Sequence, residues 1–151
     1  MESKTIPNYR IVASSFLSNG HAPWRGRLNA RPQMPYDASI DAAAWQASHR
    51  KAGEYLQVDL GSIYEVPKVA TQGRPHMHSA WVSSYSLSYA VTNGNFIDYK
   101  VHGALKVFPG NFDRDTIVTN KLPVTVRFRY IRFVVVTYSD IPAMRAEIFG
   151  C

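Results

Sequence analysis

Apolar and polar residues alternate with a period of two along most of this chain. The clearest stretch is Val82–Val91, where serine or alanine separates the apolar residues Tyr85, Leu87, Tyr89 and Val91. Successive side chains of a strand point to opposite faces, so this stretch predicts a strand with one buried and one solvated face. Residues 56–60 and 144–148 alternate in the same way. Residues 131–136 are almost continuously apolar and β-branched, which predicts a strand covered on both faces.

Turn signals separate these runs. They are Asn19-Gly20, Asn93-Gly94, Pro109-Gly110-Asn111 and the stretches around Pro23, Pro32 and Pro35. Asn93-Gly94 lies between two strand-like runs and predicts a tight hairpin. No stretch keeps the period of an amphipathic helix for more than about two turns. Many short strands with regularly spaced turns predict an all-β sandwich or barrel.

The composition is that of one globular domain covering residues 1–151. Hydrophobic residues make up 46% of the chain and aromatic residues 13%, which argues against disorder. A chain of this length can bury its own core without a metal or a disulfide. No apolar run approaches the roughly 18 residues of a membrane-spanning helix. The polar start, Met1–Lys4, lacks the apolar segment of a signal peptide.

The charge is unevenly distributed. The formal net charge is +6, and no acidic residue occurs from Ser3 to Tyr36. The basic residues of that acid-free stretch are Lys4, Arg10, Arg25, Arg27 and Arg31. A second basic cluster, Arg127, Arg129 and Arg132, follows a predicted strand and is equally consistent with solubility alone. The overall charge favours polyanionic partners such as acidic membranes, sulfated glycans or nucleic acid.

Recognised catalytic motifs are absent from the sequence, which argues against an enzyme. It contains no nucleophile elbow, no phosphate-binding glycine loop, no zinc-protease motif and no Cys-x-x-Cys. His76 and His78 form a His-x-His pattern whose imidazoles share one side of an extended segment. Without a clear third ligand, we expect two solvated loop histidines rather than a metal site. Exposed histidines of this kind would gain charge between pH 7 and 5.

Several short segments occur in a fixed order along the chain. They are Ala44-Trp45, Tyr55–Gly61, Ala70–Arg74, Arg129–Phe133 and Arg145–Cys151. Together this set resembles the discoidin domain, also called the coagulation factor V/VIII type C domain, from Ile6 to Cys151. The resemblance implies a jelly-roll β-sandwich of the galactose-binding-like kind, with ligand-binding loops gathered at one end. It also implies a recognition or adhesion module without a cofactor. A Ca²⁺ ion bound by backbone carbonyls would leave almost no trace in the sequence.

The resemblance identifies two loops, Phe16–Arg25 and Gly73–Trp81, as the expected ligand surface. The candidate ligand-binding residues are His21, Trp24, Arg25, Asp41, Arg74, His76, Met77, His78 and Trp81. Arg74 is the strongest candidate, because related collagen-binding receptors have an arginine of their ligand trench there. Those receptors also place an acid near Asp41, so Arg74 and Asp41 form either a ligand-binding pair or an internal salt bridge. Trp24 offers either a stacking face for a ligand or a plug that fastens its loop to the sandwich.

Membrane-binding members of the family carry bulky apolar residues at their loop tips. The expected tip of the first loop, Asn19–Ala22, is small and polar, and the second offers only Met77 and Trp81. The resemblance therefore ranks an anionic glycan or a protein, on a cell surface or in the matrix, above an anionic phospholipid membrane. Lipid binding, if any, is expected to be electrostatic and sensitive to salt. We expect no nucleic acid partner.

Other residues of the family segments have expected structural roles. The resemblance implies that Trp45 belongs to the core and that Asp59, Arg132, Arg145 and Glu147 form internal scaffold pairs, which satisfy buried charge.

Cys151 is the only cysteine. A disulfide commonly joins the two chain ends in this family, and Cys151 stands at the position of its C-terminal half. The expected partner would precede Met1, so we expect a domain excised from a larger extracellular protein. One alternative is that Cys151 is simply an unpaired surface thiol. The alternative for the whole protein is a cytosolic, lectin-like agglutinin that truly starts at Met1. A transcript that encodes a cysteine a few residues upstream of Met1 would favour the extracellular protein.

Overall fold

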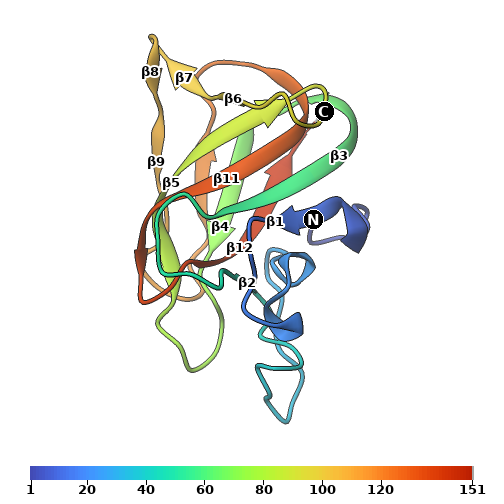
Figure 1. The fold of residues 1–151 in the computed structure, drawn as a ribbon, viewed down its shortest axis with the longest axis vertical. Helices are drawn as coiled ribbons and strands as arrows, with labels where there is room; N and C mark the ends of the chain where they lie inside the picture. The colour runs from blue at the N-terminus through green and yellow to red at the C-terminus, as the bar shows by residue number, and fades with distance from the viewer. Residues whose placement is uncertain (151) are drawn as a thin grey trace.

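The computed structural model describes residues 1–150 and consists of two antiparallel β-sheets packed face to face. The larger sheet contains β1 (Ile11–Ala13), β3 (Tyr55–Glu65), β11 (Arg127–Ser139), β5 (Trp81–Ala90) and β6 (Ile97–Asp98) in this order, with β9 (Val107–Pro109) also paired to β5. The smaller sheet has the order β10 (Val118–Lys121), β4 (Lys68–Gln72), β12 (Ala143–Phe149) and β2 (Trp45–Gln46). Figure 1 shows the long strands crossing the upper part of the molecule and several loops below them. The predicted jelly-roll sandwich is confirmed.

The remaining elements are short. A small hairpin joins β7 (Lys100–Val101) to β8 (Ala104–Leu105). The helical elements are single 3-10 turns, η1 (Asn8–Arg10), η2 (Asn19–His21) and η3 (Pro23–Arg25). The prediction that no long helix forms is therefore confirmed for the described part of the chain. Within residues 1–150, no helix combines the length and the apolar composition needed to cross a bilayer.

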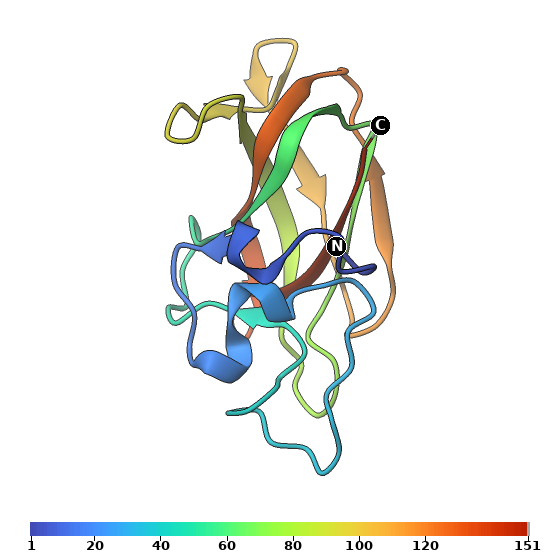
Figure 2. The same ribbon diagram turned by 90° about the vertical axis from the view of Figure 1, so that its right-hand side faces the viewer.

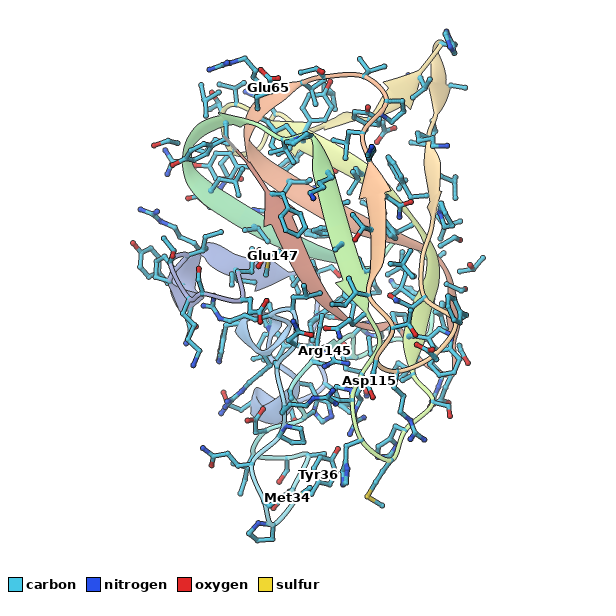
Figure 3. The ribbon with its side chains drawn as sticks, turned by 180° about the vertical axis from the view of Figure 1, so that it is seen from behind. Met34, Tyr36, Glu65, Asp115, Arg145 and Glu147 are labelled. Atoms are coloured by element: carbon cyan, nitrogen blue, oxygen red, sulfur yellow. The ribbon has the colours of Figure 1, made fainter. Side chains whose placement is uncertain are left out.

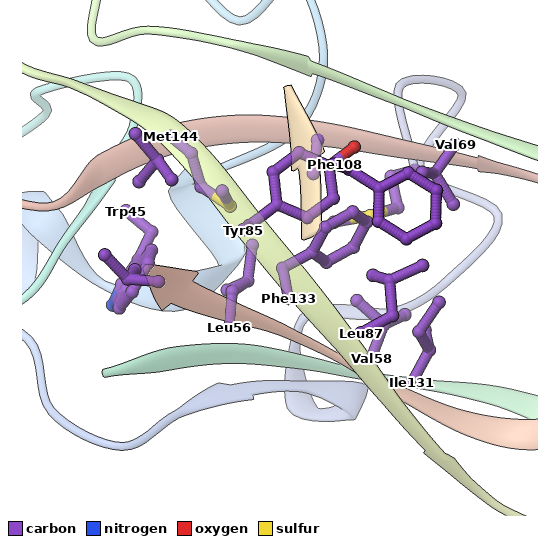
Figure 4. Packing of buried hydrophobic residues seen from close by; sticks show 14 of the residues in the cluster. Trp45, Leu56, Val58, Val69, Tyr85, Leu87, Phe108, Ile131, Phe133 and Met144 are labelled. Carbon is purple, nitrogen blue, oxygen red and sulfur yellow. The ribbon is translucent and has the colours of Figure 1, made fainter. Parts of the chain in front are cut away.

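The core lies between the inner faces of the two sheets (Figure 4). Ile131 of the central strand β11 lies between Val58 of β3 and Tyr89 of β5, so apolar residues face each other across three strands. Tyr85 stacks on Phe108 with the ring centroids 5.7 Å apart. Trp45 is completely buried, and its indole Nε1 donates a 2.8 Å hydrogen bond to the Ser15 carbonyl. The expected core role of Trp45 is thus confirmed.

Two strands are covered differently from the prediction. On β5, Tyr85 and Leu87 are buried as expected, but so are Ser86 and Ser88 on the opposite face, and Val91 lies outside the strand and is exposed. The serines are small and lie opposite larger residues of β11, which shield them from water. On β11 the outward residues of positions 131–136 are only partly buried, because no further layer covers that face.

The expected hairpin after β5 is present, but the loop that contains its turn is longer than that of a tight hairpin. The Asn95 amide donates to the Thr92 carbonyl at 3.2 Å, and Gly94 takes a left-handed φ of +97°. This turn spans Thr92–Asn95, while pairing of β5 with β6 begins only at Ile97 opposite Tyr89. The sequence therefore locates the turn correctly but not the length of the loop around it.

Most of the expected scaffold pairs exist. Arg129 donates to both carboxylate oxygens of Asp59, at 2.8 and 3.0 Å. Glu147 binds the N-terminal segment, accepting a 2.9 Å hydrogen bond from the Glu2 amide. Arg145 pairs with an acid that was not anticipated, Asp115. The expectation for Arg132 was wrong, because it has no acidic partner among the described residues.

Arg132 is held by neutral groups instead. Its Nε atom donates to Gln57 at 2.8 Å, and its guanidinium lies 4.2 Å from the ring centre of Tyr55 and 3.8 Å from that of Phe96. An arginine stacked between two aromatic rings needs no carboxylate to fix its position.

Four loops gather at one end of the sandwich, the lower end in Figures 1 and 2. We refer to them as loop A (residues 14–26), loop B (27–44), loop C (73–80) and loop D (110–117). Loop B projects farthest from the sheets. Its start is fixed to the smaller sheet, since the Leu28 amide donates to the Ala146 carbonyl of β12 at 3.0 Å.

Candidate functional site

Three of the four loops, B, C and D, are tied together at their bases by one buried arginine. Arg145 lies on the outward side of β12, where the alternation of Met144, Ala146 and Ile148 predicts a polar position, and its side chain is completely covered. It donates to the carbonyls of Gly73, Ala30 and Arg114 at 2.8, 2.9 and 2.7 Å and to Asp115 Oδ1 at 2.8 Å. Burial lowers the pKa of Arg145, but an arginine remains protonated in proteins. One charge therefore fixes the bases of loops B, C and D.

Arg74 performs a similar task closer to the loop tips. Its Nη1 donates to Gln46 Oε1 at 2.8 Å and its Nη2 donates to the Tyr36 hydroxyl in loop B at 2.7 Å. The Tyr36 ring in turn contacts the His76 imidazole edge-on, with centroids 4.5 Å apart. Only 4% of Arg74 is exposed, so it lies beneath the surface that it was expected to form. The structure assigns Arg74 the support of loops B and C.

Arg74 and Asp41 do not form the anticipated pair. Asp41 accepts a hydrogen bond from the Ala43 amide at 2.9 Å, and its carboxylate lies 3.9 Å from Nη1 of Arg25. The pair does not form because the guanidinium of Arg74 donates its hydrogen bond to Tyr36 of loop B instead. Arg25 and Asp41, both of them predicted site residues, are instead brought together.

His21 is buried and not at a loop tip. It is 5% exposed, and its Nδ1 lies 2.7 Å from the Ser18 hydroxyl. Burial, helped by the nearby charges of Arg74 and His78, lowers the pKa of His21 to about 4. Loop B covers this turn so closely that a Cβ on Gly20 would lie 2.0 Å from the Ala38 carbonyl oxygen. The prediction that residues 19–22 form a polar tip was therefore wrong.

Loop C carries Met77 at its outermost turn. His76 and Met77 have left-handed φ values of 64° and 67°, which turn the chain sharply and leave Met77 67% exposed. His78 is exposed, and desolvation lowers its pKa. His76 is half-buried against Tyr36, so only one of the two histidines is solvated as expected. No group of three potential metal-binding side chains occurs within the described range.

The two candidate tryptophans occupy different surroundings. Trp24 is half-buried, packs against the core and meets Phe16 edge-on with centroids 6.3 Å apart, so part of it does plug loop A to the sandwich. The same residue also lines a cleft with Arg25 and Asp41. Trp81, at the start of β5, lines a separate shallow depression beside loop D. The predicted site residues thus divide among four places: the tip of loop C, the support beneath it, the cleft at loop A and the depression beside loop D.

Of loop B, sequence reasoning selected only Asp41 and missed the exposed apolar residues. In loop B, the side chains of Met34 and Ile40 are 69% and 63% exposed, comparable with Met77 at 67% and Phe112 at 66% at the same end. Figure 3 shows Met34 and Tyr36 at the far end of the molecule, opposite Glu65. The available signal was two apolar residues inside a proline-bearing segment without strand periodicity. Apolar residues of a segment that forms no strand do not reach the core between the sheets, and their side chains are exposed to solvent.

Comparisons with known proteins agree with this architecture. The family model described as F5/8 type C domain matches residues 11–148. Lactadherins of Sus scrofa and Bos taurus are each 34% identical to the whole chain, which spans 37% and 36% of their lengths. Discoidin II of Dictyostelium discoideum superposes with a TM-score of 0.83 at 22% identity, over 93% of this chain and 53% of that one. The chitosan-binding module 2 of a Paenibacillus chitosanase/glucanase, solved with chitotriose, superposes with a TM-score of 0.65 at 14% identity, over 93% and 95%.

Proposed function

The chain belongs to the F5/8 type C, or discoidin, domain family, and from this membership we propose that it is a non-catalytic recognition module whose loop end binds an anionic phospholipid surface. The exposed apolar tips of loops B and C are the observation that carries the proposal. The native setting proposed with it is extracellular, as is typical of the family. The chain spans about a third of the lactadherins that it matches, so the activity of a larger parent protein is part of the same proposal.

The apolar tips have no structural task in the domain. Met34, Ile40 and Met77 are each more than 60% exposed and lie outside the core cluster. Single exposed apolar residues are common on protein surfaces, but these three lie on two loops that the Arg74–Tyr36 hydrogen bond joins. Complete burial of one such side chain contributes about 2 kcal/mol, so insertion of all three would contribute about 6 kcal/mol at most.

Charge supplies a second, smaller contribution. Arg31 in loop B is exposed, and Arg114 in loop D is partly exposed. Each basic residue close to an anionic membrane contributes about 1 kcal/mol. Asp37, Asp113 and Asp115 lie at the same end and reduce the attraction, and Asp115 already pairs with Arg31 at 2.9 Å. The apolar tips therefore dominate the proposed interaction.

This ligand differs from the one that the sequence favoured. The preference for a glycan or a protein depended on a polar tip at residues 19–22, and that turn is covered by loop B. Members of the family that bind membranes carry bulky apolar residues at their loop tips. In this chain Met34 and Ile40 meet that description, on a loop that the resemblance did not single out.

Co-sedimentation with lipid vesicles tests the proposal. We expect binding to vesicles of phosphatidylcholine with phosphatidylserine, and little binding to phosphatidylcholine alone. The double variant Met34→Asp/Ile40→Asp should bind poorly, because the new carboxylates resist both insertion and the anionic surface. Ile97→Asp/Leu105→Asp is the matched control, since both side chains are exposed apolar residues of the opposite end. Equal losses in the two double variants, or no binding by the unmodified chain, would refute the proposal.

A further inference from the structure

The outer face of the larger sheet carries a group of side chains that no further layer covers. Figure 1 shows β3, β11 and β5 side by side in front of the smaller sheet. Cross-strand pairing places Gln57, Arg132 and Ser88 directly opposite one another on this face. The rings of Tyr55 and Phe96 contact the guanidinium of Arg132. None of these residues belongs to loops A to D, so the group is distinct from the loop end.

Arg132 has donors that the domain leaves free. Its Nε atom donates to Oε1 of Gln57 at 2.8 Å, but its two terminal nitrogen atoms make no hydrogen bond within residues 1–150. Arg132 is half-buried, and neither terminal nitrogen is among the fully buried polar atoms that lack a partner, so both reach the solvent. The same holds for the amide nitrogen of Gln57 and the hydroxyl of Ser88. Donors from three neighbouring strands are therefore accessible together and lack acceptors.

The aromatic rings hold the Arg132 guanidinium in place. Its central carbon lies 4.2 Å from the ring centre of Tyr55 and 3.8 Å from that of Phe96. Phe96 in turn meets Tyr130 edge-on, with centroids 6.4 Å apart. Stacking occupies the flat faces of a guanidinium and leaves its edge available for hydrogen bonds. Because the rings already restrict the side chain, a ligand that binds this edge immobilises little further, and Arg132 is preorganised for a planar acceptor.

The acids near this face do not neutralise Arg132. Asp59 of β3 is held at both carboxylate oxygens by Arg129, at 2.8 and 3.0 Å. Asp98 of β6 stands in the same cross-strand row, but Ser88 separates it from Arg132. Strands two positions apart in a sheet are about 10 Å from each other, too far for an ion pair. The missing counterpart of Arg132 is therefore an acidic group from outside the domain.

We propose that this face is a docking surface for a partner protein that presents an aspartate or glutamate side chain to Arg132. A carboxylate is planar and singly charged, so it matches the single fork of Arg132 in shape and in charge. Gln57 and Ser88 flank the pair as further donors. Arginine and aromatic residues are enriched at the centres of protein interfaces, which is the composition found here. A flat sheet face also suits a protein surface better than a small free acid, which a cleft would enclose.

NMR titration with two short peptides tests the proposal. The probes are the tripeptide Tyr-Glu-Tyr, capped at both ends, and its neutral counterpart Tyr-Gln-Tyr. We expect the acidic peptide to cause saturable shifts of the Arg132 Nε–H signal and of the Gln57 and Ser88 backbone amides. The neutral peptide should bind about tenfold more weakly or worse, because it cannot form the charged hydrogen bonds. The proposal and its test do not depend on membrane binding by the loop tips.

Two variants separate recognition by the fork from attraction by charge alone. Arg132→Lys keeps the charge but lacks the planar fork and should weaken binding about tenfold. Arg127→Gln is the matched control, since Arg127 lies on the same strand but is 67% exposed and lies 3.9 Å from Glu65, and it should keep the affinity. Thermal unfolding verifies that each variant is folded, and Phe96→Leu, which removes one stacking ring, replaces Arg132→Lys if that variant does not fold. Absence of saturable shifts, shifts centred on loops B and C, equal binding of the two peptides, unchanged affinity of Arg132→Lys or equal weakening by Arg127→Gln would each overturn the proposal.

Discussion

Oδ1 of Asp115 lies 2.8 Å from Nη2 of Arg145, and this ion pair joins loop D to the smaller sheet (Figure 3). The two partners differ in their surroundings, because the Arg145 side chain is fully covered while that of Asp115 is half exposed. Arg145 spends its other donors on carbonyls of three loops. Asp115 is therefore only one of several acceptors, and the position of the loops depends more on the Arg145 guanidinium than on Asp115.

Substitution of Arg145 should destabilise the domain strongly. Arg145→Met removes the donors for three buried or partly buried carbonyls and leaves them unsatisfied, so we expect a loss of about 3–5 kcal/mol in the free energy of unfolding. Urea unfolding measures the loss. Arg31→Ala is the control, since Arg31 is exposed and binds the same Asp115 oxygen at 2.9 Å. A similar small effect for both variants would show that Arg145 does not hold the loops.

Removal of the Tyr36 hydroxyl should loosen loop B from loop C. Tyr36→Phe leaves a donor of the buried Arg74 without its partner, and a hydrogen bond to a charged group contributes about 1.5–3 kcal/mol. We expect a lower melting temperature and faster amide exchange in loops B and C. The control Tyr9→Phe alters a hydroxyl on a highly exposed side chain. Unchanged exchange in loops B and C would contradict the supporting role of Arg74.

Arg74→Ala should lower stability as well, because a buried guanidinium with two hydrogen bonds is lost. This expectation differs from the one drawn from the sequence, in which Arg74 is the strongest candidate for a ligand contact. Thermal unfolding of the variant distinguishes the two. A melting temperature equal to that of the unmodified chain would restore Arg74 as a ligand contact.

Stability should decrease in acid because of His21. Its pKa is lowered in the folded state from 6.5 to about 4, so between these values the unfolded chain binds more protons than the folded one. The free energy of unfolding therefore falls as the pH falls through this range, by up to about 3 kcal/mol from this residue. Urea unfolding at several pH values between 7 and 4 measures the change. His21→Gln should flatten the dependence and His102→Gln, at an exposed position, should not.

Vesicle binding should survive added salt in part. The charged contribution of Arg31 and Arg114 is screened at high ionic strength, whereas burial of Met34 and Ile40 is not. Co-sedimentation with acidic vesicles in about 0.1 M and about 1 M salt measures both contributions. Complete loss in high salt would mean that binding is electrostatic, as the sequence alone indicates, and that the tips do not insert.

The strands were predictable because apolar residues recur at every second position. Leu56 and Val58, or Tyr85 and Leu87, identify a strand and its inner face without knowledge of its neighbours. The coverage of the outer face was not predictable, since Ser86 is buried by Val134, a residue far away in the sequence. The family resemblance implied the jelly-roll sandwich and the gathering of the loops at one end.

The site was predicted less well than the fold. Loop B has no periodicity, and its path is fixed where Arg145 binds the Ala30 carbonyl and where Arg74 binds Tyr36. A backbone carbonyl leaves no mark on the identity of its residue, so Ala30 and Gly73 could not be recognised as anchors. His21 and Arg74 were placed on the surface because nothing in their own segments shows that loop B covers them.

The anchoring of the loops by buried arginines makes the domain suited to exchange of its binding specificity. Residues such as Gln33, Met34 and Ile40 are exposed and stand apart from the groups that Arg145 and Arg74 hold. Variants randomised at these positions should keep the fold of the domain while they present new surfaces. The same holds for substitutions that arise in evolution. Directed selection against unrelated targets could therefore begin from this chain without first stabilising it.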